Sequence, residues 1–282
     1  MSVITIFSIP KPFAGHIGLI QRNALASWRR LAPHVQVVLF GSDAGVAEAA
    51  AEFGARHVAD FPANAYGTPL VSAAFQLATA HATTPFVMYA NADMLFDDSL
   101  LAGVRSVAGL PRFLLSGRRW DCDITQSLVG ADDAAWAAVF AQRAERGRLH
   151  GPAGMDFFVF PRSLAVRMPE FAVGRVGWDS WLVWKCRMEG IPVVDATGTV
   201  SAVHQNHDYS QLKLGYQHTR GPERDLNIRA AGGLSHLLTL READRHLVAG
   251  RLVRPPWPQR IYALLGPNFL YQQALAFKRA RA

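Results

Sequence analysis

The sequence predicts an α/β fold in which helices flank a mostly parallel β-sheet. Half of the residues are hydrophobic and 18% are charged, which is ordinary for a globular protein. Short apolar runs alternate with segments of helical periodicity through the first hundred residues, a pattern typical of βαβ units. One run, Phe86–Ala90, is continuously apolar, as buried central strands are, and stops abruptly at Asn91-Ala92-Asp93. A carboxylate at the carboxyl end of such a strand lies where α/β sheets bind ligands.

The first half has the more regular pattern. Its helix at residues 68–80 should begin with Thr68 as the cap and Pro69 in the first helical position. A helix after residue 93 should be capped by Asp97, Asp98 or Ser99. The expected strands are residues 3–9, 35–40, 56–58 and 86–90, and the other expected helices are residues 17–31 and an alanine-rich segment through residue 53.

The second half is less regular, and the patterning loosens further after residue 209. We expect one domain at residues 1–215 and a basic, amphipathic helical extension at residues 216–282, in which Pro255–Pro258 separates a final segment. The expected strands of this half are residues 113–116, 155–160, 192–194 and 199–203, and its expected helices are residues 134–146 and 178–188.

The net charge of +7 is unevenly distributed. From Arg251 to Ala282 the chain has six basic residues and no acidic one, whereas the remaining 250 residues have 23 basic and 22 acidic side chains. The basic balance therefore belongs to the tail and does not indicate a nucleic-acid groove.

Cysteine content and hydropathy indicate the compartment. Two cysteines, Cys122 and Cys186, do not make a disulfide framework and suit a reducing cytosol. The amino terminus has no basic segment ahead of its apolar run, so no signal peptide is expected. No apolar run approaches the roughly 20 residues of a spanning helix. We expect a cytoplasmic protein, soluble or peripheral on the inner face of the cell membrane.

Five short motifs follow one another in order between residues 3 and 210. They are K-P-F-x-G-H-I at Lys11–Ile17, G-R-R-W-D at Gly117–Asp121, D-F-F-V-F at Asp156–Phe160, G-W-D-S-W-L-V-W at Gly177–Trp184 and A-V-H-Q-N-H-D-Y at Ala202–Tyr209. Their order and spacing resemble a family of bacterial glycosyltransferases with the GT-A fold, a Rossmann-related fold that uses nucleotide-diphosphate sugars. The resemblance implies a donor nucleotide half at residues 1–95 and a metal and acceptor half at residues 96–215.

In the GT-A fold, a D-x-D-like motif after a buried strand holds a divalent metal against the donor diphosphate. The resemblance implies that Asn91-Ala92-Asp93 is this motif, with Asp93 as the direct ligand. A diphosphate leaving group develops negative charge, which a hard cation held by oxygen ligands neutralises. Asp121-Cys122-Asp123 is a rival because it is a literal D-x-D. The two arginines beside it would compete with a cation for its carboxylates.

Two histidines near residue 205 are further metal candidates. His204 ends an apolar strand, and the resemblance implies that it completes the metal site. His207 could share that role or bind phosphate, and a structural role is the alternative for both. Imidazole is a workable ligand for Mn²⁺ and a poor one for Mg²⁺, so the pattern favours Mn²⁺.

Asp179, within Gly177-Trp178-Asp179-Ser180, is the candidate general base that the resemblance implies. An inverting glycosyl transfer needs a carboxylate to remove the proton of the attacking acceptor hydroxyl. The alternative role is the N-cap of the following helix, because Asp is a favoured capping residue. The two roles are compatible.

The resemblance also implies residues for the two substrates, a donor of UDP, GDP or dTDP type and a glycan or lipid-linked acceptor. A turn role for Asp43 and core packing for Trp178 are the alternatives. The expected donor contacts are Ser8, Pro10, Phe13, Asp43, Gly67, Thr68, Asn91, Ala92 and Asp93. The expected acceptor contacts are Arg118, Arg119, Asp121, Asp156 and Trp178.

The tail combines aromatic residues with the six basic ones, which suits an anionic membrane surface. Packing on the domain, or a contact between two copies in a homodimer, is the alternative.

Two rival functions of the whole protein also remain. One is a metal-dependent nucleotidyltransferase, although the segment after the first strand lacks the usual glycine-rich loop. The other is a catalytically inactive glycan-binding or membrane-docked scaffold.

Overall fold

The computed structural model of the chain describes residues 2–164, 166–207 and 221–265. Within these residues the main sheet has nine strands, and all are parallel except β9 and β13. The predicted mostly parallel sheet is therefore confirmed. In spatial order the strands are β13 (Arg251–Val253), β12 (Arg245–Val248), β10 (Val193–Asp195), β6 (Leu114–Ser116), β9 (Phe157–Pro161), β4 (Phe86–Ala90), β1 (Ile4–Ser8), β2 (Val35–Phe40) and β3 (Arg56–Val58).

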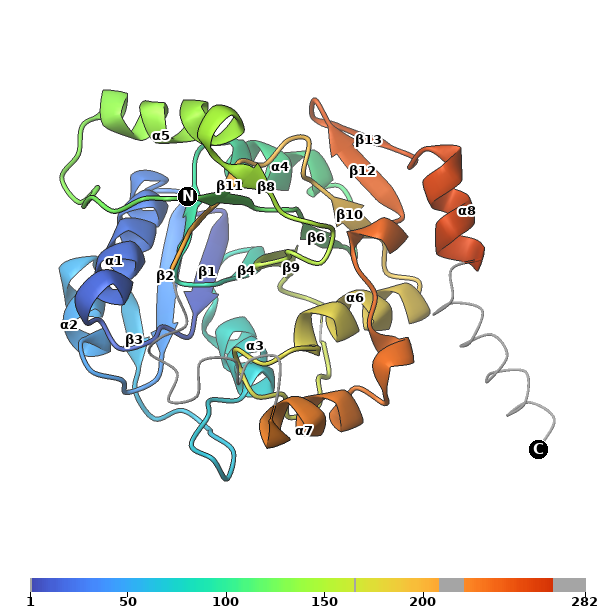
Figure 1. Cartoon of the computed structure of the whole chain (residues 1–282), viewed down its shortest axis with the longest axis horizontal. Helices are drawn as coiled ribbons and strands as arrows, with labels where there is room; N and C mark the ends of the chain where they lie inside the picture. Colours follow the sequence, from blue (N-terminus) through green and yellow to red (C-terminus); the bar gives the residue numbers. More distant parts are fainter. Residues whose placement is uncertain (1, 165, 208–220, 266–282) are drawn as a thin grey trace.

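Helices cover both faces of this sheet, so that the molecule has three layers (Figure 1). One face is covered by α1 (Gly15–Arg30), α2 (Val46–Glu52), α4 (Ser99–Val107) and α5 (Asp133–Arg146). The other face is covered by α3 (Val71–His81) and α6 (Trp178–Met188). The remaining helical elements are α7 (Pro222–Ala230), α8 (Trp257–Leu265) and the short 3₁₀ turns η1 (Leu234–His236) and η2 (Leu240–Glu242).

The central strands are apolar at every position because both of their faces are buried. In β4, Met88 and Ala90 pack with α1 and α4, whereas Val87 and Tyr89 pack with α3 and α6. Successive side chains of a strand point to opposite faces, so one continuous apolar run supplies two cores.

A second, four-stranded sheet lies at the carboxyl end of β4, and the pairing of its strands determines which side chains meet there. In spatial order it consists of β5 (Met94–Phe96), β11 (Ala202–Gln205), β7 (Trp120–Cys122) and β8 (Arg148–Leu149). His204 on β11 pairs with Met94 on one side and with Asp121 on the other. This pairing brings three segments far apart in the sequence to one place.

Buried polar side chains fasten this small sheet to α1. Asn23 donates to the Gln205 Oε1 atom at 3.0 Å, and the Gln205 amide nitrogen donates to the backbone oxygens of Ile20 and Asp93. Trp28 Nε1 donates to the Met94 oxygen at 2.9 Å. Since unpaired polar groups are costly in a core, these bonds restrict the position of β5 relative to β11.

Some predicted boundaries differ from the structure. The third helix begins at Val71 rather than at Thr68, because Pro69 and Leu70 form extended bridges with Ala63 and Ala172. The strand expected at 199–203 runs instead over 202–205, because a turn bonds Thr199 back to Ala196.

The extension expected to be helical from residue 216 also contributes strands in its described part. β12 and β13 lengthen the main sheet beyond β10, and α8 follows them. Residues 266–282, which carry the rest of the aromatic and basic tail, lie outside the described residues. Among the described helices, none combines the length and apolarity that crossing a bilayer requires.

Candidate active site

A cavity of about 510 Å³ lies at the carboxyl ends of β1, β2 and β4. Ligand sites of open α/β sheets form at this edge, because the loops that leave parallel strands converge there. Many of the residues predicted for donor, metal and acceptor line this one cavity. They are Pro10, Asp43, Gly67, Thr68, Asn91, Ala92, Asp93, Arg119, Asp156, His204 and His207.

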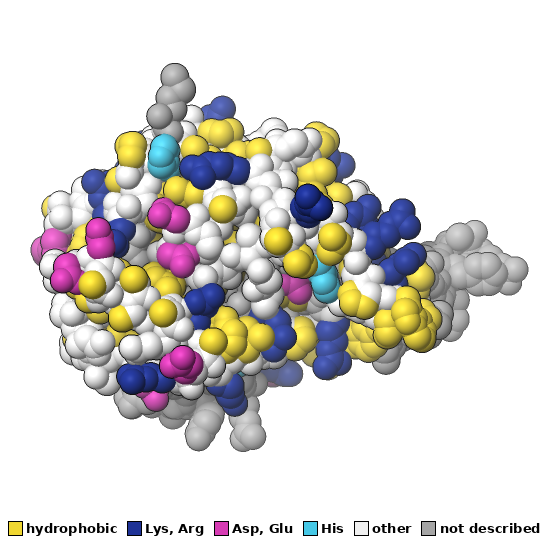
Figure 2. All heavy atoms as spheres, turned by 90° about the horizontal axis from the view of Figure 1, so that it is seen from above, with side chains coloured by type: hydrophobic (Ala, Val, Ile, Leu, Met, Phe, Trp, Pro, Cys, Tyr) yellow, Lys and Arg dark blue, Asp and Glu magenta, His cyan; other side chains and the backbone are white. Residues whose placement is uncertain are grey.

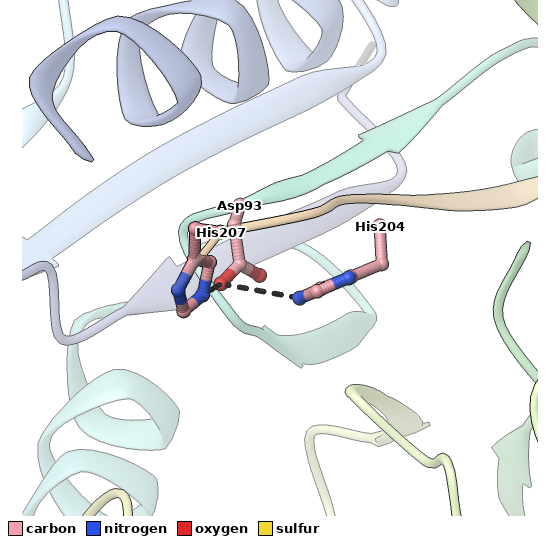
Figure 3. A group of neighbouring side chains, drawn as sticks. All are labelled: Asp93, His204 and His207. Carbon is pink, nitrogen blue, oxygen red and sulfur yellow. Dashed lines mark hydrogen bonds and ion pairs between the residues drawn. The ribbon is translucent and has the colours of Figure 1, made fainter. Parts of the chain in front are cut away.

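Asp93, His204 and His207 form a compact cluster in the cavity wall (Figure 3). The Asp93 Oδ2 atom lies 3.3 Å from His207 Nε2 and 3.7 Å from His204 Nε2. Each residue offers one ligand atom, and these three atoms lie within 4.8 Å of one another. Asp93 directly precedes β5 and His204 lies on β11, so the pairing of these strands holds the cluster together.

The electrostatics of the cluster fit a cation. Burial alone would raise the pKa of Asp93, but the positive charge of His204, a hydrogen bond from His207 and the charge of Lys11 hold it well below its usual range. Among the described residues, the buried Asp93 Oδ1 atom has no hydrogen-bond partner. An ionised carboxylate with an unused buried oxygen beside two imidazoles is suited to a divalent metal.

The second nitrogen of His204 faces another carboxylate. His204 Nδ1 lies 3.4 Å from Asp121 Oδ1. Burial tends to lower the pKa of His204, but Asp93 and the contact with Asp121 raise it. Metal-ligating histidines usually have such a partner, which fixes the ring and its tautomer.

The rival motif at 121–123 does not present two carboxylates to one cation. Asp121 is buried and contacts Arg119 Nε and His150 Nδ1, each at 2.8 Å. Asp123 is exposed and accepts a hydrogen bond from Asn206. Asp121 therefore orients Arg119 and also contacts His204.

A chain of hydrogen bonds crosses the cavity floor from β4. The Tyr89 hydroxyl donates to Asn91 Oδ1, and Asn91 Nδ2 donates to Asp156 Oδ1, both at 2.8 Å. The other oxygen of Asp156 pairs with Arg119. An amide can accept from one neighbour and donate to the next, which a carboxylate cannot do. This explains an asparagine in the first position of the motif, directed toward Asp156.

Asp179 lies in the first turn of α6 and is partly buried. The helix N-cap is Gly177, not Asp179, and the Asp179 Oδ1 atom accepts from the Ser180 amide at 2.8 Å. Burial, with a further contribution from the charge of Asp156, raises the pKa of Asp179 to about 6. Asp179 is not among the residues that line the cavity, although it lies close enough to interact with Asp156.

Two predicted donor contacts lie elsewhere than in the cavity wall. Ser8 is fully buried at the end of β1, and its hydroxyl has no partner among the described residues. Phe13 packs against Gly45, and the Arg22 guanidinium lies 5.4 Å from the centre of its ring.

Three predicted acceptor contacts also lie outside the cavity, and Asp121, described above, is one of them. Trp178 is 6% exposed and packs edge-on against Tyr89, Phe75 and Phe158, which is the core-packing alternative. Arg118 lines a separate cavity, and its Nε atom donates to the His150 oxygen at 2.6 Å.

Sequence reasoning missed several residues of the cavity. Lys11 belongs to the K-P-F-x-G-H-I motif, and its charge acts on Asp93. Arg175 precedes the Gly177–Trp178 segment and forms a 2.7 Å ion pair with Glu223 of α7. A basic residue in or just before a quoted motif was the available signal for Lys11 and Arg175, whereas nothing in the sequence pairs Arg175 with Glu223.

The sheet order, the antiparallel β9 and the Asp93–His204–His207 cluster at the carboxyl edge of the sheet define a GT-A fold. The chain is similar to glucosyl-3-phosphoglycerate synthase of M. tuberculosis, with 16% identity, a TM-score of 0.50, and 82% of this chain and 81% of that chain covered. It is also similar to a mannosyltransferase of Pyrobaculum calidifontis solved with GDP-Man and Mn²⁺, with 17% identity, a TM-score of 0.48, and 99% and 80% covered. No protein-family model and no curated protein matches the chain.

Proposed function

We propose that the protein is a metal-dependent glycosyltransferase that moves a sugar from a nucleotide-diphosphate donor to a hydroxyl of a glycan or lipid-linked acceptor, with inversion. The observation that carries the proposal is the Asp93–His204–His207 cluster at the carboxyl edge of a GT-A sheet. Its buried Asp93 Oδ1 atom, without a partner among the described residues, supports a cation there.

Asp93, His204 and His207 would hold the metal. Two imidazoles among three ligands favour Mn²⁺ over Mg²⁺, which prefers oxygen ligands and its own waters. When bound, the metal neutralises the negative charge that develops on the diphosphate leaving group.

The donor nucleotide would occupy the part of the cavity near β1 and β2. Asp43 is exposed there and can accept hydrogen bonds from a base or ribose, and Gly67 and Thr68 also line the cavity. UDP, GDP and dTDP sugars are the donors that we would test first.

Asp179 would act as the general base. The acceptor oxygen forms a bond to the anomeric carbon, the bond from that carbon to the donor phosphate oxygen breaks, and the acceptor proton passes to the Asp179 carboxylate. A pKa of about 6 suits this role, because the group is mostly ionised near neutral pH and is still basic enough to take a proton. Asp156 and Arg119 would orient the acceptor from the cavity floor.

Calorimetric titration with UDP, GDP and dTDP, with and without Mn²⁺, tests the proposal. We expect one nucleotide to bind, and to bind much more tightly with Mn²⁺. Absence of metal-dependent nucleotide binding would refute the enzyme proposal and leave the glycan-binding scaffold.

Product analysis separates the two enzyme classes. Glycosyl transfer releases a nucleoside diphosphate from a nucleotide sugar, whereas nucleotidyl transfer releases pyrophosphate from a nucleoside triphosphate. Release of pyrophosphate alone would favour the nucleotidyltransferase.

We also propose that the carboxyl-terminal region docks on an anionic membrane, peripheral to the cytoplasmic face. Trp257, Ile261 and Leu264 are 70%, 44% and 56% exposed and follow one another at helical spacing along α8, with the exposed Arg260 among them. Figure 2 shows hydrophobic and basic side chains together at the end of the molecule where β13 and α8 lie. From Arg245 to the last residue the sequence has seven basic and no acidic side chains, a charge complementary to anionic lipids.

A further inference from the structure

A second cavity, of about 420 Å³, lies along the same edge of the main sheet as the candidate active site. It is formed where β6 and β10 end, and η2, β12 and α8 complete its wall. Its polar lining includes Arg118, Asp195, Arg241, His246 and Tyr262. The carboxyl edge of the sheet therefore has two cavities.

The second cavity has several hydrogen-bond donors that the protein does not use in ion pairs. Within the described residues, neither Arg118 nor Arg241 forms an ion pair, and the buried His246 Nε2 atom has no hydrogen-bond partner. The Arg241 guanidinium lies over the Tyr262 ring, 5.7 Å from its centre. The one carboxylate, Asp195, already accepts through Oδ1 from the amide and hydroxyl of Thr197.

Two guanidinium groups and an imidazole around one cavity are suited to an anion. Guanidinium binds carboxylate and phosphate through paired, charge-assisted hydrogen bonds, and an aromatic ring beside it provides a surface for a sugar. The carboxylate of Asp195 accepts hydrogen bonds from Thr197, and the two arginines leave the cavity lining with a net positive charge.

A shared wall separates this cavity from the candidate active site. Arg118 and Arg119 are consecutive, yet Arg118 lines the second cavity and Arg119 lines the first. The His150 backbone oxygen accepts from Arg118, while its Nδ1 atom contacts Asp121 beside His204. Because the two cavities meet at consecutive residues, a ligand must be longer than one sugar to contact both of them.

We propose that the second cavity is an acceptor subsite that binds an anionic sugar unit through its carboxylate or phosphate. This role rests on the proposed glycosyltransferase function, whereas the binding of the anionic sugar itself does not. Arg118 and Arg241 bind the anion, His246 donates a further hydrogen bond, and the neighbouring sugar unit presents its hydroxyl to the first cavity.

Nuclear magnetic resonance of the histidine side chains of the full chain tests the site. Glucuronate, glucose 6-phosphate and glucose are titrated, and the His246 signal is assigned by its loss in His246→Asn. We expect the His246 signal to shift with glucuronate, glucose 6-phosphate or both, but not with glucose. The two charged probes distinguish a carboxylate from a phosphate ligand.

A pair of double variants shows whether the effect is local. Arg118→Ala/Arg241→Ala should weaken binding of the charged sugar at least tenfold. Arg251→Ala/Arg254→Ala removes the same charge from exposed positions in and directly after β13, and should leave binding unchanged. Equal weakening in both variants, an equal response to glucose, or no shift of His246 would overturn the proposal.

Metal-dependent UDP binding separates this proposal from the proposed function. We expect Arg118→Ala/Arg241→Ala to bind UDP and Mn²⁺ as the unaltered protein does. If the unaltered protein binds the charged sugar at His246 but binds no nucleotide, the acceptor role is refuted together with the glycosyltransferase proposal.

Discussion

His204 and Asp121 are directly paired across the parallel strands β11 and β7, and His204 Nδ1 lies 3.4 Å from Asp121 Oδ1. The opposite ring nitrogen faces Asp93 at 3.7 Å. One strand register thus sets both the position and the orientation of a candidate metal ligand. The carboxylate of Asp121 favours the tautomer that leaves Nε2 available to a cation.

The Asp121→Asn variant should weaken Mn²⁺ binding about 10- to 100-fold, because a histidine ligand loses the carboxylate that orients it. Calorimetric titration with Mn²⁺ measures the effect. Asp123→Asn is the matched control, since Asp123 is exposed and accepts a hydrogen bond from Asn206. If both variants bind Mn²⁺ like the unaltered protein, Asp121 has no role in the site.

Metal binding should be linked to pH and to stability. Asp93 and Asp121 raise the pKa of His204 above its ordinary value of 6.5 against the effect of burial, so a cation must displace a proton there. Mn²⁺ affinity should therefore fall as pH is lowered through the raised pKa of His204. At 100 times its dissociation constant, Mn²⁺ should stabilise the fold by about 2.7 kcal/mol.

Thermal unfolding with Mn²⁺ or with a chelator, from pH 6 to pH 8, measures this linkage. His204→Ala should remove most of the Mn²⁺-dependent rise in melting temperature. His34→Ala, outside the cluster, is the control variant. A rise of equal size in both variants would contradict the assignment of His204.

The Asn91→Asp variant should destabilise the protein, although it restores an acid at the first position of the motif. A carboxylate cannot donate to Asp156, and it would place like charges where a 2.8 Å hydrogen bond now exists. We expect a loss of about 1–3 kcal/mol in the free energy of unfolding at pH 7.

The pH dependence of this loss identifies its cause. The pKa of the new carboxyl should be raised, so the loss should be full at neutral pH and should diminish as pH falls through that pKa. Urea denaturation at pH 5 and pH 8 measures both values. A loss independent of pH would indicate a packing defect instead of charge repulsion.

The Asp179→Asn variant should lose turnover by at least 100-fold while binding the donor normally, because an amide cannot accept the acceptor proton. It should also be more stable above pH 6. The pKa of Asp179 rises from 3.8 to about 6 on folding, so its ionisation costs folding free energy as pH rises through that interval.

We expect Asp179→Asn to gain about 1 kcal/mol at pH 8, below the ~3 kcal/mol ceiling of a two-unit shift because the side chain is only partly buried. The gain should vanish near pH 4. Donor titration, turnover and thermal unfolding measure the three quantities. Full turnover with normal donor binding would remove Asp179 as the base and leave the rest of the site unchanged.

The strands and the metal candidates could be predicted because their signals are local. Phe86–Ala90 is apolar at each position since both faces are buried, and Asp93 and His204 each lie at or near the end of such a run. The contact between His204 and Asp121 depends instead on pairing over 83 positions of the chain, which no local pattern reveals.

The directions of individual side chains near the site could not be predicted from the sequence either. Arg118 and Arg119 have the same chemistry and adjacent positions, yet they line different cavities. Trp178 follows a glycine at a helix start, a place suited to substrate contact, but it packs into the aromatic core. Side-chain direction there follows from tertiary packing and not from residue type.

The exposed face of α8 should determine membrane binding. Trp257→Ser/Leu264→Ser should reduce co-sedimentation with vesicles of anionic phosphatidylglycerol at least tenfold, because the two side chains are 70% and 56% exposed and would enter the headgroup region. Neutral phosphatidylcholine vesicles should bind the unaltered protein only weakly.

Leu226→Ser/Leu234→Ser is the matched control for that variant, since these leucines are 42% and 60% exposed outside α8. It should bind anionic vesicles like the unaltered protein. If the unaltered protein fails to bind them, sedimentation analysis shows whether a second copy covers the α8 face. A dimer that dissociates in Trp257→Ser/Leu264→Ser would show that the α8 face forms a homodimer contact instead of a membrane contact. An apolar helix face that is buried between two subunits cannot contact lipid.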